Sequence, residues 1–224
     1  MMKYMIHASP QRMWYVDNFL LPSLEAQGIP REEICVWCDT DGKGNLFSFM
    51  ESARVCGRLG DGSVWHLQDD VAVCSDFAAR TQAISSGVAN GFACRNWDLC
   101  ADMAGTMPVK FAWYSFQCIR IPNAIAGELA DWFYREARYR NVYADRIQSN
   151  KGDDWFFRAF LRERYGKSTV TNIKPNLVEH VDFLIGGTLI NKNRLLQFNR
   201  SAHWAEPALV EELEKQIKAY QAGR

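Results

Sequence analysis

Apolar and polar positions alternate in blocks along the first seventy residues, and these blocks predict alternating strands and helices. Between the strands, apolar residues recur at helical spacing from Met13 to Gly28 and again from Leu46 to Val55. Strand, helix, strand, helix, strand predicts a parallel sheet with crossover helices. Three short apolar runs, each ended by turn-forming or acidic residues, predict the buried strands: residues 3–8, 33–38 and 63–67.

The second part of the chain has a less regular pattern but continues the same fold class. Its apolar runs predict strands at residues 91–95, 115–121 and 181–185. Its amphipathic stretches predict helices at residues 126–138, 153–164 and 207–221. The prediction is an α/β chain of one Rossmann-like domain, residues 1–224, with a mixed, mostly parallel sheet flanked by helices.

Composition narrows the class of protein. Hydrophobic residues make up 48% of the 224 residues and aromatic residues 13%, which excludes an intrinsically disordered chain. Lys plus Arg and Asp plus Glu both number 26, so no overall charge attracts nucleic acid or a membrane surface. The seven cysteines are an odd number, and no run approaches the roughly 18 apolar residues of a membrane span. We therefore expect free thiols and a cytoplasmic location.

Polar clusters follow each of the first three predicted strands. They are His7-Ala8-Ser9, Asp39-Thr40-Asp41 and Gln68-Asp69-Asp70. In open α/β sheets, ligands bind beyond the carboxyl ends of the strands. We therefore expect these side chains to meet at one edge of the sheet.

The pair Asp69-Asp70 is the strongest local signal. Two carboxylates directly after a hydrophobic strand are unfavourable unless something neutralises them. Mg²⁺ or Mn²⁺ would do so, because hard cations prefer carboxylate oxygens and substrate phosphates. The alternative is a solvated acidic turn that caps the following segment.

Two later motifs carry weaker signals. Asp153 and Asp154 open a predicted helix, where one aspartate serves as a cap and the other is available as a base; capping by both is the alternative. His180 is either a satisfied core residue or a ligand. Gly186-Gly187 is either an ordinary turn or a backbone approach to a phosphate.

Together these signals resemble the glycosyltransferases of GT-A fold. The run from His66 to Val71 is similar to the acidic metal motif of that fold, in particular to the Leu-Glu-Asp-Asp form of lipopolysaccharide-type glycosyltransferases. The resemblance extends in layout over residues 3–191. One departure is Gln68, which stands where the family usually has an acid.

The resemblance implies a metal-dependent transfer of a sugar from a nucleotide-sugar donor to a hydroxyl acceptor. Residues 1–75 would form the nucleotide-binding half, and residues 76–224 the half that completes the acceptor and metal sites. The acceptor is left open among a glycan, a lipid-linked sugar, a protein and a modified nucleic acid.

The resemblance also implies a role for each site residue. Asp70 and His180 would bind Mn²⁺ or Mg²⁺. Asp153 or Asp154 would be the catalytic base of an inverting reaction. The donor nucleotide and sugar would contact the remaining predicted site residues: His7, Ser9, Asp39, Asp69, Gly186 and Gly187.

Two other functions remain open on sequence alone. A metal-dependent phosphoesterase or nuclease also uses clustered Asp and His, but this chain has four histidines and no repeated His-x-Asp cluster. A non-catalytic nucleotide-sugar-binding domain is the second alternative, and Gln68 in the acidic motif favours it.

Overall fold

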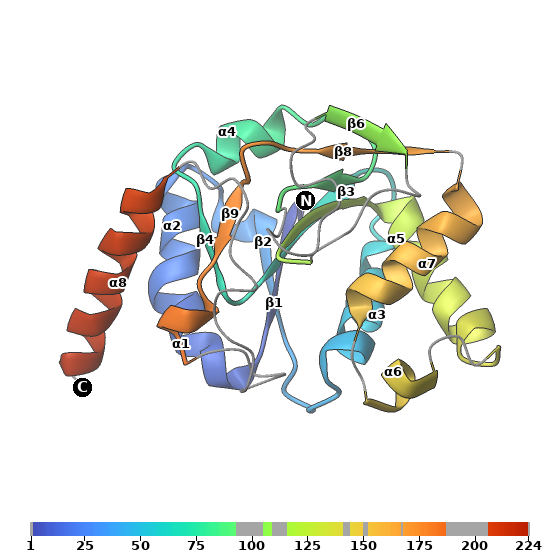
Figure 1. The fold of residues 1–224 in the computed structure, drawn as a ribbon, viewed down its shortest axis with the longest axis horizontal. Coiled ribbons are helices and arrows are strands. Elements are labelled where there is room, and N and C mark those ends of the chain that lie inside the picture. Colours follow the sequence, from blue (N-terminus) through green and yellow to red (C-terminus); the bar gives the residue numbers. More distant parts are fainter. Residues whose placement is uncertain are drawn as a thin grey trace.

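The computed structural model describes residues 2–92, 105–108, 116–140, 144–149, 152–166, 168–186 and 206–223. Its main feature is a mixed sheet in which five of seven strands run in one direction. Figure 1 shows helices on both sides of this sheet. The strand order is β2-β1-β3-β7-β5-β8-β6. The bounds are β1 Tyr4–Ala8, β2 Ile34–Cys38, β3 Ser63–Gln68, β5 Ala89–Asn90, β6 Gly105–Pro108, β7 Cys118–Pro122 and β8 Thr169–Asn172.

A second, two-stranded sheet lies beside the first. It pairs β4 (Val71–Val73) with β9 (Val178–His180) in antiparallel register. β4 begins three residues after β3 ends, so the chain passes from the large sheet to the small one at Asp69-Asp70.

Helices cover both faces of the large sheet. One face packs against α3 (Asn45–Cys56), α5 (Asn123–Trp132) and α7 (Asp153–Tyr165). The other face packs against a nearly continuous helical segment at residues 10–26, which contains α1 (Met13–Tyr15) and α2 (Leu21–Ala26). Further α-helices among the described residues are α4 (Phe77–Gln82), α6 (Ala144–Ser149) and α8 (Pro207–Ala222).

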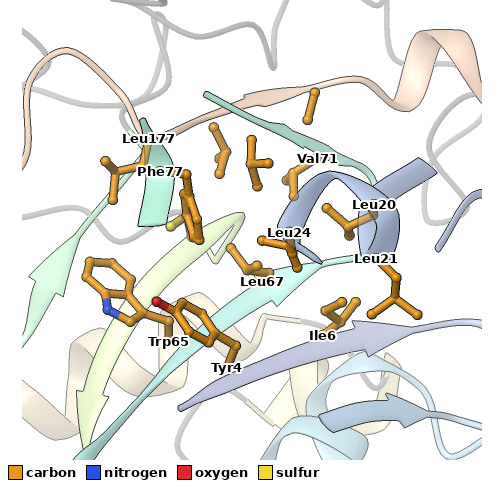
Figure 2. Close-up of a cluster of buried hydrophobic side chains, with 14 of the residues drawn as sticks. Tyr4, Ile6, Leu20, Leu21, Leu24, Trp65, Leu67, Val71, Phe77 and Leu177 are labelled. Atoms are coloured by element: carbon orange, nitrogen blue, oxygen red, sulfur yellow. The ribbon is translucent and has the colours of Figure 1, made fainter. Parts of the chain in front are cut away.

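Alternation along β1 shows how the sequence divides the two cores. Ile6 belongs to the cluster on the α2 face, whereas its neighbour Met5 belongs to the cluster on the α3 face. Figure 2 shows Ile6 and Leu67 from the sheet pointing toward Leu24 of α2. Each of these three side chains is fully buried, and each such burial stabilises the fold by about 1.5–3 kcal/mol.

A glycine pair sets the close approach of α3 and α5. Gly57 follows the last residue of α3, and Gly127 lies within α5. A Cβ atom on Gly57 would stand 2.5 Å from the Cα of Gly127, so no other residue fits there without moving a helix.

The predicted early strands and the long helices are confirmed, but the strand predicted at residues 181–185 is wrong. Asp182–Leu184 is a 3₁₀ turn, and the strand lies earlier, at β9. The reason is the pairing with β4, which ends when the Val181 N–H donates to the Asp70 carbonyl at 2.7 Å. Of the strand predicted at 91–95, residues 93–95 lie outside the described residues.

Two further findings concern the described residues as a whole. Within them, no helix combines the length and the apolar character needed to cross a membrane. Cys35 and Cys38 on β2 are both free thiols and are half-buried.

Candidate functional site

The acidic pair occupies the junction between the two sheets and is buried there. Asp69 and Asp70 are each 6% exposed, which contradicts the alternative of a solvated acidic turn. Because β1 is the parallel neighbour of β3, the residues that follow β1 lie beside the pair. The carboxyl edge of β1 and β3 therefore brings Ser9 and Arg12 to the acidic pair.

Asp69 is held by groups that follow β1. Its Oδ2 accepts the Ser9 backbone N–H at 2.7 Å and the Ser9 hydroxyl at 3.0 Å. Its Oδ1 accepts Nη1 of Arg12 at 2.9 Å. Burial and the neighbouring Asp70 charge nevertheless raise the pKa of Asp69. Ser9, predicted to lie near a nucleotide, thus anchors the acidic pair.

Asp70 joins the N-terminal and C-terminal parts of the chain. Its Oδ2 lies 3.1 Å from Nε2 of His180 and also accepts Nη1 of Arg12. Burial alone would raise the pKa of Asp70, but the His180 ring and the Arg12 guanidinium hold it well below its usual range. Asp70 is therefore an ionised carboxylate within a buried ion-pair network.

Arg12 is the site residue that sequence reasoning missed. It lies in the first turn after β1 and is 4% exposed. Its guanidinium contacts both aspartates, at Asp69 Oδ1 and Asp70 Oδ2. The available signal was a single basic residue shortly after the end of β1, beside the strand that ends in the acidic pair.

His180 comes from β9 and is also buried. In the antiparallel register it stands opposite Val71, the residue after the acidic pair. Its Nδ1 lies 3.9 Å from Oδ1 of Asp182, a carboxylate that is 3% exposed. Burial raises the pKa of Asp182. His180 thus lies between two buried carboxylates.

The arrangement of Asp70 and His180 does not fit a divalent cation as it stands. Asp70 Oδ2 already contacts Arg12 and His180, and His180 Nε2 faces that oxygen at hydrogen-bonding distance rather than an open position. The other oxygen, Oδ1, is enclosed and has no hydrogen-bond partner among the residues that the structure describes. Asp70 and His180 are close enough to share a ligand, but the guanidinium of Arg12 already supplies the positive charge beside Asp70. The metal role of these two residues stays a prediction.

His7 lies on the opposite face of the sheet, in a pair of stacked imidazoles. Its Nε2 is 2.9 Å from Nδ1 of His66, and both rings contact Phe49 of α3. Burial lowers the pKa of His7 to about 4 and holds the pKa of His66 well below its usual value. Both rings are therefore neutral at pH 7. The predicted contact of His7 with a nucleotide stays a prediction.

Asp39 supports the loop between β2 and α3. Its Oδ1 accepts the Lys43 N–H at 2.8 Å, and its Oδ2 accepts the Gly44 N–H at 2.6 Å. Both oxygens therefore fix the backbone that leads into α3. Its predicted contact with a base or ribose stays untested.

Asp153 and Asp154 have different environments at the start of α7. Asp153 is 7% exposed, and its Oδ1 accepts Nδ2 of Asn45 at 3.1 Å. Burial raises the pKa of Asp153 to about 6. Asp154 is half-buried, and its Oδ1 accepts the Trp155 N–H at 2.9 Å. The N-cap residue of α7 is Gly152, so the prediction that one of the two aspartates is the cap is wrong. A pKa of about 6 suits a general base at neutral pH, so Asp153 is the candidate base.

Asn45 places Asp153 at the carboxyl edge of the sheet, because α3 begins directly after the loop that follows β2.

Aromatic contacts connect the same region. Phe116 lies 4.5 Å from Phe49 of α3 and 5.4 Å from Phe157 of α7, measured between ring centroids. Phe116 and Phe49 therefore connect α7 to the imidazole rings of His7 and His66.

The glycine pair is only partly described. Gly186 has a φ of 102°, a backbone conformation that favours glycine. Gly187 lies outside the described residues, and the predicted contact of the glycine pair with a phosphate stays a prediction.

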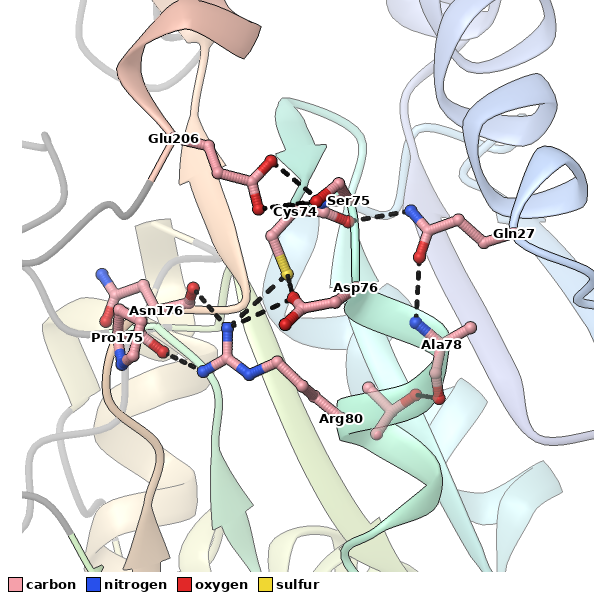
Figure 3. Close-up of polar contacts among 10 residues, drawn as sticks. Gln27, Cys74, Ser75, Asp76, Ala78, Arg80, Pro175, Asn176 and Glu206 are labelled. Atoms are coloured by element: carbon pink, nitrogen blue, oxygen red, sulfur yellow. Dashed lines mark hydrogen bonds and ion pairs between the residues drawn. The ribbon is translucent and has the colours of Figure 1, made fainter.

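A different group of potential metal ligands lies where β4 leads into α4. The ligand atoms of Cys74, Asp76 and Glu206 all lie within 4.8 Å of one another, so this group could hold a metal ion. Figure 3 shows its existing partners: Asp76 accepts the Cys74 thiol at 3.1 Å, and Glu206 accepts the Ser75 N–H at 3.1 Å. Arg80 lies 3.6 Å from Asp76, and burial raises the pKa of Cys74 to about 12. A protonated thiol and a nearby guanidinium both oppose cation binding.

Comparisons with known proteins leave the family open. No protein-family model matches the chain, and no curated protein matches it. Among solved structures, the chain matches the crystal structure of HddC from Yersinia pseudotuberculosis with a TM-score of 0.31 and 8% identity. That match covers 57% of this chain and 80% of HddC. At this level of similarity it assigns neither a family nor an activity.

Proposed function

We propose that this chain is a glycosyltransferase that takes a sugar from a nucleotide-sugar donor and passes it to a hydroxyl acceptor. The observation that carries the proposal is the contact between Asp70 and His180, 3.1 Å apart. One residue follows the third strand of the sheet and the other comes from β9. The resemblance noted in the sequence requires such a meeting of a strand-end acid with a C-terminal histidine.

The position of the contact supports a nucleotide-sugar ligand. The Asp70–His180 contact lies at the carboxyl edge of β1 and β3, where open α/β sheets bind their ligands. Arg12 and Ser9 lie at the same edge and fix the acidic pair. A rigid edge of this kind suits a transfer reaction, because the acidic pair keeps its position while a ligand binds beside it.

Asp153 would act as the base in this reaction. Its raised pKa, about 6, keeps it largely ionised at neutral pH and still able to accept a proton. It would take the proton from the acceptor hydroxyl as that oxygen attacks the sugar carbon, and the nucleoside diphosphate would leave. This direct displacement inverts the configuration at that carbon.

The test is a panel of nucleotide-sugars scored by thermal shift and by release of nucleoside diphosphate. Water serves as the acceptor, because the physiological acceptor is open among a glycan, a lipid-linked sugar, a protein and a modified nucleic acid. A donor at 100 times its Kd should raise the Tm by roughly 5–11 °C. Asp70→Asn should abolish the shift, whereas Asp61→Asn, at an exposed position away from the site, should not.

Each alternative has its own outcome. Binding of a donor without release of diphosphate under any acceptor would identify a non-catalytic binding domain. Cleavage of simple phosphodiesters or phosphomonoesters, with no response to sugar donors, would identify a phosphoesterase. Either result would replace the proposal.

A further inference from the structure

The buried acidic pair needs a counter-charge, and the structure supplies it from within the chain. Asp69 and Asp70 are each 6% exposed, and two adjacent carboxylates at such a depth repel each other. Among the described residues, the basic side chains that contact the pair are Arg12 and His180. Arg12 carries a permanent charge, since a guanidinium stays protonated in proteins.

The contacts of Arg12 are those of a bridging cation. One nitrogen, Nη1, lies 2.9 Å from Asp69 Oδ1 and also donates to Asp70 Oδ2. A divalent ion between two carboxylates would make the same pair of contacts. Because the side chain of Arg12 is itself buried, the guanidinium does not compete with water for these partners.

The same contacts leave neither oxygen of Asp70 open to a metal ion. An ion on Asp70 Oδ2 would displace Arg12 or lie against it, and two cations at that distance repel each other. An ion on Asp70 Oδ1 would have to enter an enclosed position. His180 Nε2, the other predicted ligand, points at Oδ2.

We propose that the guanidinium of Arg12 is the resident cation of the acidic pair, in the role that the sequence pattern predicts for Mn²⁺ or Mg²⁺. The pair then binds no divalent metal in the native protein. Arg12 acts as a positioning residue: it holds Asp70 against His180 and fixes the segment after β1 to the junction of the two sheets.

The test uses the full chain and manganese alone, so it stands apart from the proposed function. Binding of Mn²⁺ is measured by electron paramagnetic resonance, and the Tm is measured with EDTA and with about 1 mM MnCl₂. The native protein should shift by less than about 1 °C between the two, since an ion that does not bind does not stabilise. Its Mn²⁺ spectrum should remain that of the free ion.

Removal of the guanidinium should create the metal dependence that the native protein lacks. Arg12→Gln should lower the Tm in EDTA by roughly 6–20 °C, because it leaves buried carboxylates without their cation. Added Mn²⁺ should recover part of that loss in Arg12→Gln and none of it in Arg12→Gln with Asp70→Asn. Arg120→Gln is the matched control: Arg120 is also buried but donates to the carbonyls of Gly87 and Ser85. It should lose stability without recovery by Mn²⁺.

One result would overturn the proposal however the Arg12 variants behave. If the native protein binds one Mn²⁺ and Asp70→Asn or His180→Gln abolishes that binding, the acidic pair binds a metal and Arg12 is not its resident cation. Should Arg12→Gln fail to fold, Arg12→Lys keeps the charge, and its insensitivity to Mn²⁺ is then the expected result. Stabilisation of Arg12→Lys by Mn²⁺ through Asp70 would also contradict the proposal.

Discussion

Changing Asp153 to Asn should make the protein more stable and less active, a combination that separates a functional carboxyl from a structural one. Asp153 is 7% exposed, and burial raises its pKa from 3.8 to about 6. A carboxyl group whose pKa is raised in the folded protein is still ionised at neutral pH, and its buried charge then destabilises the folded state. Asn has nearly the same shape and no charge, and its carbonyl can still accept the Asn45 hydrogen bond.

The magnitude follows from the shift in pKa. About 2 pH units at about 1.4 kcal/mol each give roughly 3 kcal/mol. The unfolded chain loses this proton near pH 3.8 and the folded chain near pH 6, so the native protein loses stability as the pH rises through that window. At pH 7 Asp153→Asn should therefore gain up to about 3 kcal/mol, which is roughly 6–12 °C in Tm. Near pH 4 the gain should almost vanish.

The assay is a series of thermal melts from pH 4 to pH 7, combined with turnover of a confirmed donor. As the base of the reaction, Asp153 should be needed only in the transition state, so its change to Asn should lower kcat by about 10²–10⁴-fold. Asp154→Asn is the control, because its side chain can keep the bond to the Trp155 N–H. It should change stability by less than about 1 kcal/mol and leave turnover near normal.

Two results would refute this reasoning. Melting curves of Asp153→Asn that parallel those of the native protein at every pH would show that the carboxyl is not held in an unfavourable charged state. Near-normal turnover in Asp153→Asn, with a confirmed donor and acceptor, would place the base elsewhere.

Further predictions concern packing and acid sensitivity. Gly57→Ala should destabilise the protein by about 1–3 kcal/mol in urea unfolding, because the new Cβ meets the Gly127 backbone at 2.5 Å; unchanged stability would mean that α3 and α5 separate freely. The pKa of His7 lies near 4 when folded and 6.5 when unfolded, so stability should fall by roughly 3 kcal/mol as the pH drops through that window. His7→Gln should flatten this decline in acid melts, and an equally steep decline would locate the sensitivity elsewhere.

The sequence predicted those parts of the fold that depend on local pattern. β1, β2, β3, α3 and α7 have strong periodicity or long apolar runs, and all lie close to their predicted bounds. The short strands β4 and β9 were not predicted. They have three residues each, and the pairing between distant segments defines them more than their own composition.

The site was predictable in its acids and less so in their partners. Because Asp69 and Asp70 directly follow an apolar strand, the sequence alone predicts an unfavourable free energy of burial and a need for a neutralising cation. That the cation is Arg12 depends on β1 lying next to β3, which places the residues after both strands side by side. Asp153 and Asp154 differ for a similar reason, because the partner of Asp153 is Asn45, 108 positions away.

The contact between Asp70 and His180 has a consequence for synthesis of the chain. About 110 residues separate the two partners, so β3 emerges from the ribosome long before β9 exists. At about 5–20 residues per second the interval is roughly 5–20 s. During that time Asp70 lacks both its histidine and the strand that closes over it. A nascent chain can therefore form the β1–β2–β3 core early, whereas the edge that carries the acidic pair is completed only after β9 has been synthesised.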